Sequence, residues 1–203
     1  MFENNLGGIT STKDGKYIYV IETGNNKALK LDASSLKVLD GYKTGNGPDG
    51  IGISKDESKI YTTNTKDGTI SVINIKSKKS RLLEVCGKPE LVHYNHDNSL
   101  LFISNFKLNK IHIIDTKTDK IVHEITDLIS PEEAVLSKSE KLLYVVNLGA
   151  KKVFVYDAST YKKLHEEYSV GNKPIGVIPA FNDSKLFVSN YGDTSVSAIH
   201  LDY

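Results

Sequence analysis

The sequence predicts an all-β protein, a β-propeller made of four-stranded antiparallel blades. Three observations lead to this prediction. A motif of apolar run, polar turn and second apolar run occurs five times in the 203 residues. The copies lie about 42 residues apart, which is the period of a four-stranded propeller blade. The runs last five to seven residues and are rich in Val, Ile, Tyr and Thr, as strands are. The copies are IYVIETGNNKALKLD (18–32), IYTTNTKDGTISVIN (60–74), LFISNFKLNKIHIID (101–115), LYVVNLGAKKVFVYD (143–157) and LFVSNYGDTSVSAIH (186–200).

The spacing of three anchor positions defines the repeat. The first apolar run ends at Glu22, Asn64, Asn105, Asn147 and Asn190. The second run ends ten residues later in every copy, at Asp32, Asn74, Asp115, Asp157 and His200. A proline stands 16 residues before the first anchor in four copies, at Pro48, Pro89, Pro131 and Pro174. All variation in length falls between the second anchor and the next proline, which indicates rigid units joined by surface connections.

Each repeat is expected to contribute four strands, the motif supplying the second and third. The first strand follows the proline, at residues 51–54, 91–94, 134–137 and 176–179. The fourth is expected at residues 36–40, 80–85, 120–125 and 163–168. Near-continuous apolar runs such as KLLYVVN indicate strands buried on both faces, as in blades packed face to face. We expect one domain over residues 1–203, with repeats at about 7–47, 48–88, 89–130, 131–173 and 174–203.

The ends of the repeat array predict an incomplete ring. The fifth copy stops at Asp202-Tyr203, before a fourth strand. Closure of five blades would require residues 1–6, MFENNL, to act as that strand, but this segment is short and its two Asn residues disfavour strand structure. We therefore expect an arc of blades.

Composition gives little support to nucleic acid or membrane as a partner. Hydrophobic content of 39%, charged content of 25% and a net charge of +1 are ordinary for a globular protein and give no strong field toward nucleic acid or membrane. Arg81 is the single arginine, and Cys86 is the single cysteine, so no intrachain disulfide can form. No apolar window is long enough to span a membrane. The sequence as given indicates a cytoplasmic protein, and a truncated N-terminus would favour the cell envelope or an extracellular location.

Segments of the repeat resemble the YVTN β-propeller family. They read PDGI (48–51), KIYTTN (59–64) and SVIN (71–74), with KLLYVVN (141–147) and KLFVSN (185–190) in later copies. The family includes YncE-like, surface-layer-type and lactonase-like propellers and usually has seven blades. The resemblance implies a binding or adhesion scaffold, typically outside the cytoplasm. Glu22 and His200 depart from the family pattern.

Three acidic residues, Asp49, Glu90 and Glu132, occupy the same repeat position, directly after a proline. Symmetry predicts that they share one rim of the central channel, just before the innermost strand. They could bind a hard cation such as calcium, or they could be solvated charges. Ile175 and Gly7 interrupt the series.

The histidines of the third repeat are a poor match to a metal site. His93 and His96 stand three residues apart, with His112 and His123 later in the repeat. Zinc requires three or four ligands at one place, which this spacing does not provide. His93 is expected to line the channel from the innermost strand. The anchor Asn residues and the Asp32, Asn74, Asp115 and Asp157 series are expected to satisfy turns.

The sequence therefore favours a non-enzymatic scaffold that binds a protein or cell-surface partner. The candidate ligand-binding residues at the channel rim are Asp49, Glu90, Glu132 and His93. One alternative is a lactonase-like hydrolase that uses the channel mouth. A second is single-stranded nucleic-acid binding by the lysine-rich outer strands, with Tyr161 and Tyr168 as stacking candidates. No catalytic residue, metal, cofactor, membrane span or oligomeric state is assigned.

Overall fold

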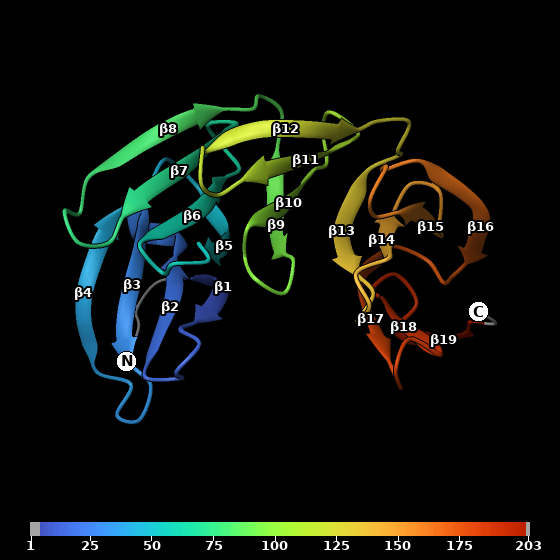
Figure 1. Ribbon diagram of the computed structural model, residues 1–203, viewed down its shortest axis with the longest axis horizontal. Helices are drawn as coiled ribbons and strands as arrows, with labels where there is room; N and C mark the ends of the chain where they lie inside the picture. The colour runs from blue at the N-terminus through green and yellow to red at the C-terminus, as the bar shows by residue number, and fades with distance from the viewer. Residues whose placement is uncertain (1–4, 202–203) are drawn as a thin grey trace.

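The computed structural model describes residues 5–201 and confirms the all-β propeller (Figure 1). Within this range the strands form four four-stranded sheets and one three-stranded sheet, each in sequence order. Blade 1 comprises β1 (Leu6–Ser11), β2 (Tyr17–Glu22), β3 (Lys27–Asp32) and β4 (Val38–Lys43), with a 3-10 turn η1 (Thr23–Asn25). Blade 2 comprises β5 (Pro48–Ile53), β6 (Lys59–Asn64), β7 (Thr69–Asn74) and β8 (Ser80–Glu84). Blade 3 comprises β9 (Pro89–Tyr94), β10 (Leu100–Asn105), β11 (Lys110–Asp115) and β12 (Lys120–Ile125). Blade 4 comprises β13 (Pro131–Leu136), β14 (Leu142–Asn147), β15 (Lys152–Asp157) and β16 (Lys163–Ser169). Blade 5 comprises β17 (Pro174–Ala180), β18 (Lys185–Asn190) and β19 (Ser195–His200).

The innermost strands begin earlier than predicted. Each of β5, β9, β13 and β17 starts at its proline, three residues before the expected start in blade 2. Pro48 pairs with Asn64, and the register then shifts before Ile51 pairs with Thr62. Proline lacks an N–H, so it suits the first residue of a strand, and the shift is a β-bulge. The acids that follow the prolines therefore lie inside these irregular strands and not before them, which corrects the prediction.

The outer strand of blade 1 begins later than predicted. Residues 36–40 were expected to form it, but Leu36 has φ of 56° and belongs to a turn, and β4 starts at Val38. The amide of Leu36 donates to the carbonyl of Asp32, which closes that turn. The other outer strands lie within one residue of their expected bounds.

The blades form an arc, as predicted. Consecutive innermost strands pack against one another: β1 on β5, β5 on β9, β9 on β13 and β13 on β17. No comparable packing joins β17–β19 to β1 or β2 within residues 5–201, and Figure 1 shows blades 1 and 5 at the two ends of the arc. Of the segment considered for closure, residues 1–4 lie outside the described range, and Leu6 belongs to β1.

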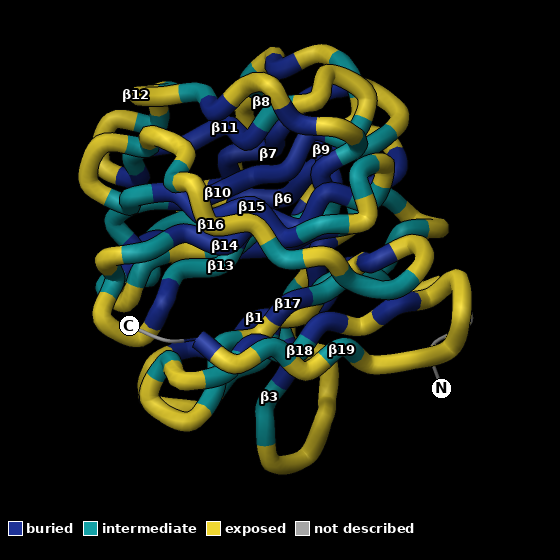
Figure 2. The backbone as a smooth tube through the Cα atoms, turned by 90° about the vertical axis from the view of Figure 1, so that its right-hand side faces the viewer, coloured by how far each residue is buried: buried dark blue, intermediate teal, exposed yellow. Residues whose placement is uncertain are grey.

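The hydrophobic core lies between the blades. Tyr144, Val146, Val153 and Val155 of blade 4 are fully buried in a cluster with Val177 and other apolar residues of blade 5. Similar clusters join blade 3 to blade 4 and blade 2 to blade 3. Figure 2 shows the buried residues concentrated in the middle strands and the exposed ones in turns and outer strands. The single-domain assignment over residues 1–203 stays a prediction.

The anchor residues stabilise turns, as expected. The side-chain amide of Asn64 donates to the hydroxyls of Thr69 and Ser71, and Asn64 is fully buried. Asp157 Oδ1 accepts from the backbone amides of Ser159 and Thr160. Such Asx turns start each crossing to the fourth strand. In the described part of the chain, no helix is long and apolar enough to cross a membrane.

Candidate functional site at the innermost strands

The structure brings the three predicted acids together. Glu132 of β13 hydrogen bonds to Glu90 of β9, and the charges of Glu90 and Asp49 both act on Glu132. Lys88, which precedes β9, forms an ion pair with Glu90. Three consecutive blades thus contribute one carboxyl each to a cluster around a single ammonium group. We call Asp49, Glu90, Glu132 and Lys88 the rim cluster.

Burial and mutual repulsion control protonation in the rim cluster. Burial, the negative charge of Glu90 and the hydrogen bond to it raise the pKa of Glu132 to about 7. Burial and the charge of Glu90 also raise the pKa of Asp49. The hydrogen bond with Glu90 raises the pKa of Lys88, so this residue stays cationic. The cluster therefore holds a proton on Glu132 in part of the molecules near neutral pH.

The backbones of β5 and β9 approach each other closely beside the rim cluster. The hydroxyl of Thr63 donates to the carbonyl of Glu90 at 2.5 Å and accepts from the amide of Gly50 at 2.8 Å. A Cβ atom at Gly50 would lie 2.4 Å from the carbonyl oxygen of Glu90. A glycine is therefore needed where β5 approaches β9, and this close approach places Asp49 next to Glu90.

A second polar pair lies further along the innermost strands. His93 of β9, predicted to line the channel, is half-buried, and its Nε2 lies 2.6 Å from Oε1 of Glu133 in β13. The other carboxylate oxygen of Glu133 accepts from the amide of Val177 in β17 at 2.6 Å. His93 therefore contacts Glu133 and is not part of the rim cluster.

Sequence reasoning missed Glu133 and Lys88. A signal for Glu133 was present, because the other repeats place small or apolar residues at its position: Gly8, Gly50, Leu91 and Gly176. Lys88 carried no such signal, since its role depends on an ion pair that only the fold creates.

The remaining histidines do not form a metal site. His112 is buried in β11, with Nε2 3.2 Å from the side-chain amide of Asn105 and Nδ1 2.8 Å from Glu124, and burial lowers its pKa. His123 stacks on Tyr161 at a centroid distance of 4.8 Å. Among residues 5–201, no three His, Cys, Asp or Glu side chains are placed to hold one metal ion. The rim cluster also contains Lys88, whose ammonium group pairs with Glu90.

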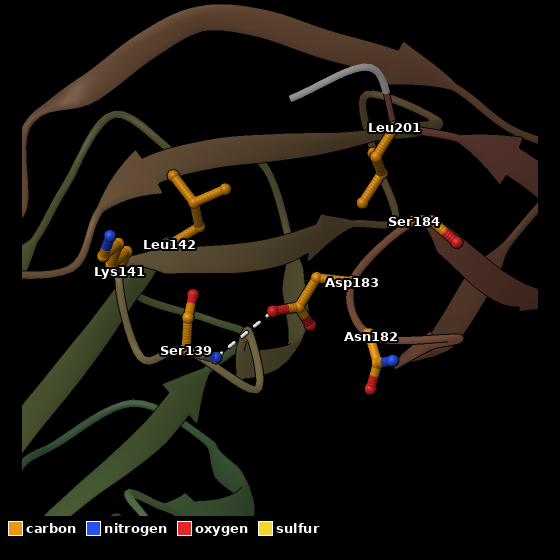
Figure 3. Close-up of a pocket in the computed structure, with 7 residues that line it drawn as sticks. All are labelled: Ser139, Lys141, Leu142, Asn182, Asp183, Ser184 and Leu201. Atoms are coloured by element: carbon orange, nitrogen blue, oxygen red, sulfur yellow. Dashed lines mark hydrogen bonds between the residues drawn. The ribbon is translucent and has the colours of Figure 1, made fainter.

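Hollows at the turns between blades are products of the repeat. One of about 470 Å³ lies between blades 4 and 5, lined by residues that include Ser139, Leu142 and Asp183 (Figure 3). The amide of Ser139 donates to Asp183 there at 3.2 Å, which links the two blades. A similar hollow of about 400 Å³ lies between blades 2 and 3. The two hollows lie at equivalent turns, and neither is lined by a rim-cluster residue. We therefore assign no specific function to either hollow.

The stacking residues proposed for nucleic acid face inward. Tyr161 packs against His123 and Phe102, and Tyr168 packs against the blade 4–5 core. Both rings are therefore partly covered by neighbouring side chains, and the nucleic-acid alternative stays a prediction.

Comparisons with known proteins agree on the fold. A protein of unknown function from Desulfotomaculum acetoxidans DSM 771 superposes with a TM-score of 0.82 at 12% identity, over 98% of this chain and 67% of that chain. Hydrazine synthase of Kuenenia stuttgartiensis superposes with a TM-score of 0.53 at 12% identity, over 96% of this chain and 95% of that chain. No curated protein matches the sequence. The family model described as lactonase, 7-bladed beta-propeller, matches residues 4–176. The chain thus belongs to the seven-bladed lactonase β-propeller family.

Proposed function

We propose that this protein hydrolyses lactones at the rim cluster. The observation that carries the proposal is the convergence of three carboxyls from three blades around Lys88, with Glu132 partly protonated near neutral pH. Membership of the lactonase family supports the same reaction class. The enzyme alternative raised by the sequence is therefore preferred here over a purely non-enzymatic scaffold.

The chemistry assigns a role to each group. Lactone hydrolysis requires water to attack the carbonyl carbon and the ring C–O bond to break, with a proton delivered to the departing ring oxygen. Protonated Glu132 donates that proton, and a pKa near the working pH suits a group that must both give and regain it. The ammonium of Lys88 offers positive charge to the carbonyl oxygen as it becomes an oxyanion. Asp49 and Glu90 keep the proton on Glu132 by repulsion.

The test is hydrolysis of a panel of lactones of different ring size, followed by pH-stat. Glu132→Gln should lower kcat by about 10²- to 10⁴-fold, the usual contribution of a general acid. The matched control is Glu166→Gln on exposed β16, which should leave kcat unchanged. kcat/KM should fall as pH rises through about 7, because Glu132 then loses its proton. No hydrolysis above the buffer rate, or equal rates for the two variants, would contradict the proposal.

A further inference from the structure

The His93–Glu133 pair is a feature that blade packing does not require. At the repeat position of His93 the other blades have Thr10, Gly52, Val135 and Ile178. At the position of Glu133 three of the four other blades have glycine. The blades that lack these residues form equivalent sheets, so neither side chain is needed for the fold. A buried carboxylate is costly to desolvate, and one that the fold can omit calls for a different explanation.

The geometry of the pair orients the imidazole. The side chain of Glu133 is 15% exposed and is held on one side by the amide of Val177 and on the other by His93. An ionised carboxylate only accepts hydrogen bonds, so Nε2 of His93 carries the proton in this contact. The lone pair of neutral His93 is then on Nδ1, which makes no hydrogen bond to the described residues. The side chain of His93 is 39% exposed, so this nitrogen lies within reach of a ligand or water.

The pair lies close to the rim cluster. His93 and Glu90 are three residues apart on β9, which is about 10 Å along a strand. Glu132 and Glu133 are neighbours on β13, the first bonded to Glu90 and the second to His93. Both polar groups therefore lie on the same two neighbouring strands, β9 and β13.

We propose that His93 is the general base of the lactone hydrolysis and that Glu133 is its positioning residue. The proposal rests on the proposed function, which leaves the acceptor of the water proton unassigned. Nδ1 of His93 takes a proton from water while the water oxygen bonds to the carbonyl carbon. The ring C–O bond then breaks, and Glu132 gives its proton to the departing oxygen. The imidazolium passes its proton to Glu132 through solvent, so both groups regain their starting states, and the product is the hydroxy acid.

The experiment measures kcat and KM for His93→Gln and Glu133→Gln on whichever lactone the intact protein hydrolyses. His93→Gln should lower kcat by about 10²- to 10⁴-fold and leave KM within about threefold. Glu133→Gln should lower kcat by about 10- to 100-fold, because it loosens the imidazole without removing it. The control is His165→Gln on exposed β16, which should change neither constant. Imidazole added to His93→Ala should restore part of kcat, a rescue that a merely structural role would not show.

Two results would overturn the inference, and they are distinguishable. If the intact protein hydrolyses a lactone and His93→Gln keeps more than about a third of kcat, His93 is not the base, although the proposed function stands. If no lactone is hydrolysed, the proposed function and this assignment fall together.

Discussion

Two sets of acidic residues recur at fixed repeat positions and behave in opposite ways. In the Asx turns, hydrogen bonds from the hydroxyls and amides of the next residues lower the pKa of Asp32 and of Asp157 to about 2. In the rim cluster, burial and a neighbouring carboxyl raise the pKa of Glu132 to about 7. The turn acids find donors within their own blade, whereas the rim acids face one another across blades. An acidic residue that recurs at one repeat position can therefore have either of two roles. Hydrogen bonds from its own blade indicate a structural role in a turn, whereas contacts with acids of other blades indicate a candidate site.

The largest loss of stability is expected from a new buried carboxylate that has neither the hydrogen-bond donors of the Asx turns nor a neighbouring carboxyl to share its environment. Val72 is 5% exposed in β7 and belongs to the apolar cluster between blades 2 and 3. Val72→Asp should lower the free energy of unfolding by about 3–5 kcal/mol, because it buries a charge without donors. Denaturant unfolding measures the change. The control is a one-residue insertion within residues 170–173, the loop between β16 and β17, which should cost little because the equivalent loop is one residue longer after β12. An equal loss of unfolding free energy from the substitution and the insertion would contradict the packing of Val72 between blades 2 and 3.

Glu132→Gln should change how stability depends on pH. The folded-state pKa of about 7 lies above the ordinary value of 4.5, so the folded protein binds more protons between these values. Stability should therefore fall as pH rises through this window. Gln mimics the protonated form, so the variant should lack this loss and exceed the intact protein at pH 8 by about 1–2 kcal/mol, after allowing for partial solvent screening. Unfolding at pH 5 and pH 8 measures it. A parallel decline in both proteins would show that Glu132 is not the group responsible for it.

Asp157→Ala should lower the midpoint of thermal unfolding at pH 7, and its effect on stability should be smaller than those of Val72→Asp and Glu132→Gln. The Asx turn would lose its acceptor, and the loss should shrink as pH falls toward 2, where the native carboxyl becomes protonated. Asp157→Asn is the matched control, because Asn74 already occupies this position in blade 2 and accepts from the amide of Ser77. It should keep most of the stability. Equal loss in both variants would show that charge, and not the turn, matters.

Asp49→Asn should have the smallest effect. It removes one of the negative charges that raise the pKa of Glu132 and should lower that pKa, since burial and Glu90 still contribute more. The pH at which kcat/KM declines should move down accordingly. An upward movement, or none, would place Asp49 outside the cluster.

Much of the fold was predictable because the same pattern of strands and turns occurs in every repeat. Five copies with a constant spacing of anchor residues predicted the second and third strands of every blade. The start of the innermost strands was not predictable from apolar pattern, because Pro48 and its bulge interrupt the pairing with Asn64. The convergence of Asp49, Glu90 and Glu132 followed from symmetry. Glu133 and Lys88 did not, since their roles depend on contacts between strands of different blades.

The contrast between the two sets of acids can be measured directly by a carbon-13 NMR titration of all side-chain carboxyls in one sample. The account predicts that Glu132 titrates near pH 7, while Asp32 and Asp157 titrate near pH 2. A Glu132 midpoint close to the ordinary glutamate value of 4.5 would contradict it, because burial and the charge of Glu90 would then not raise the pKa of Glu132.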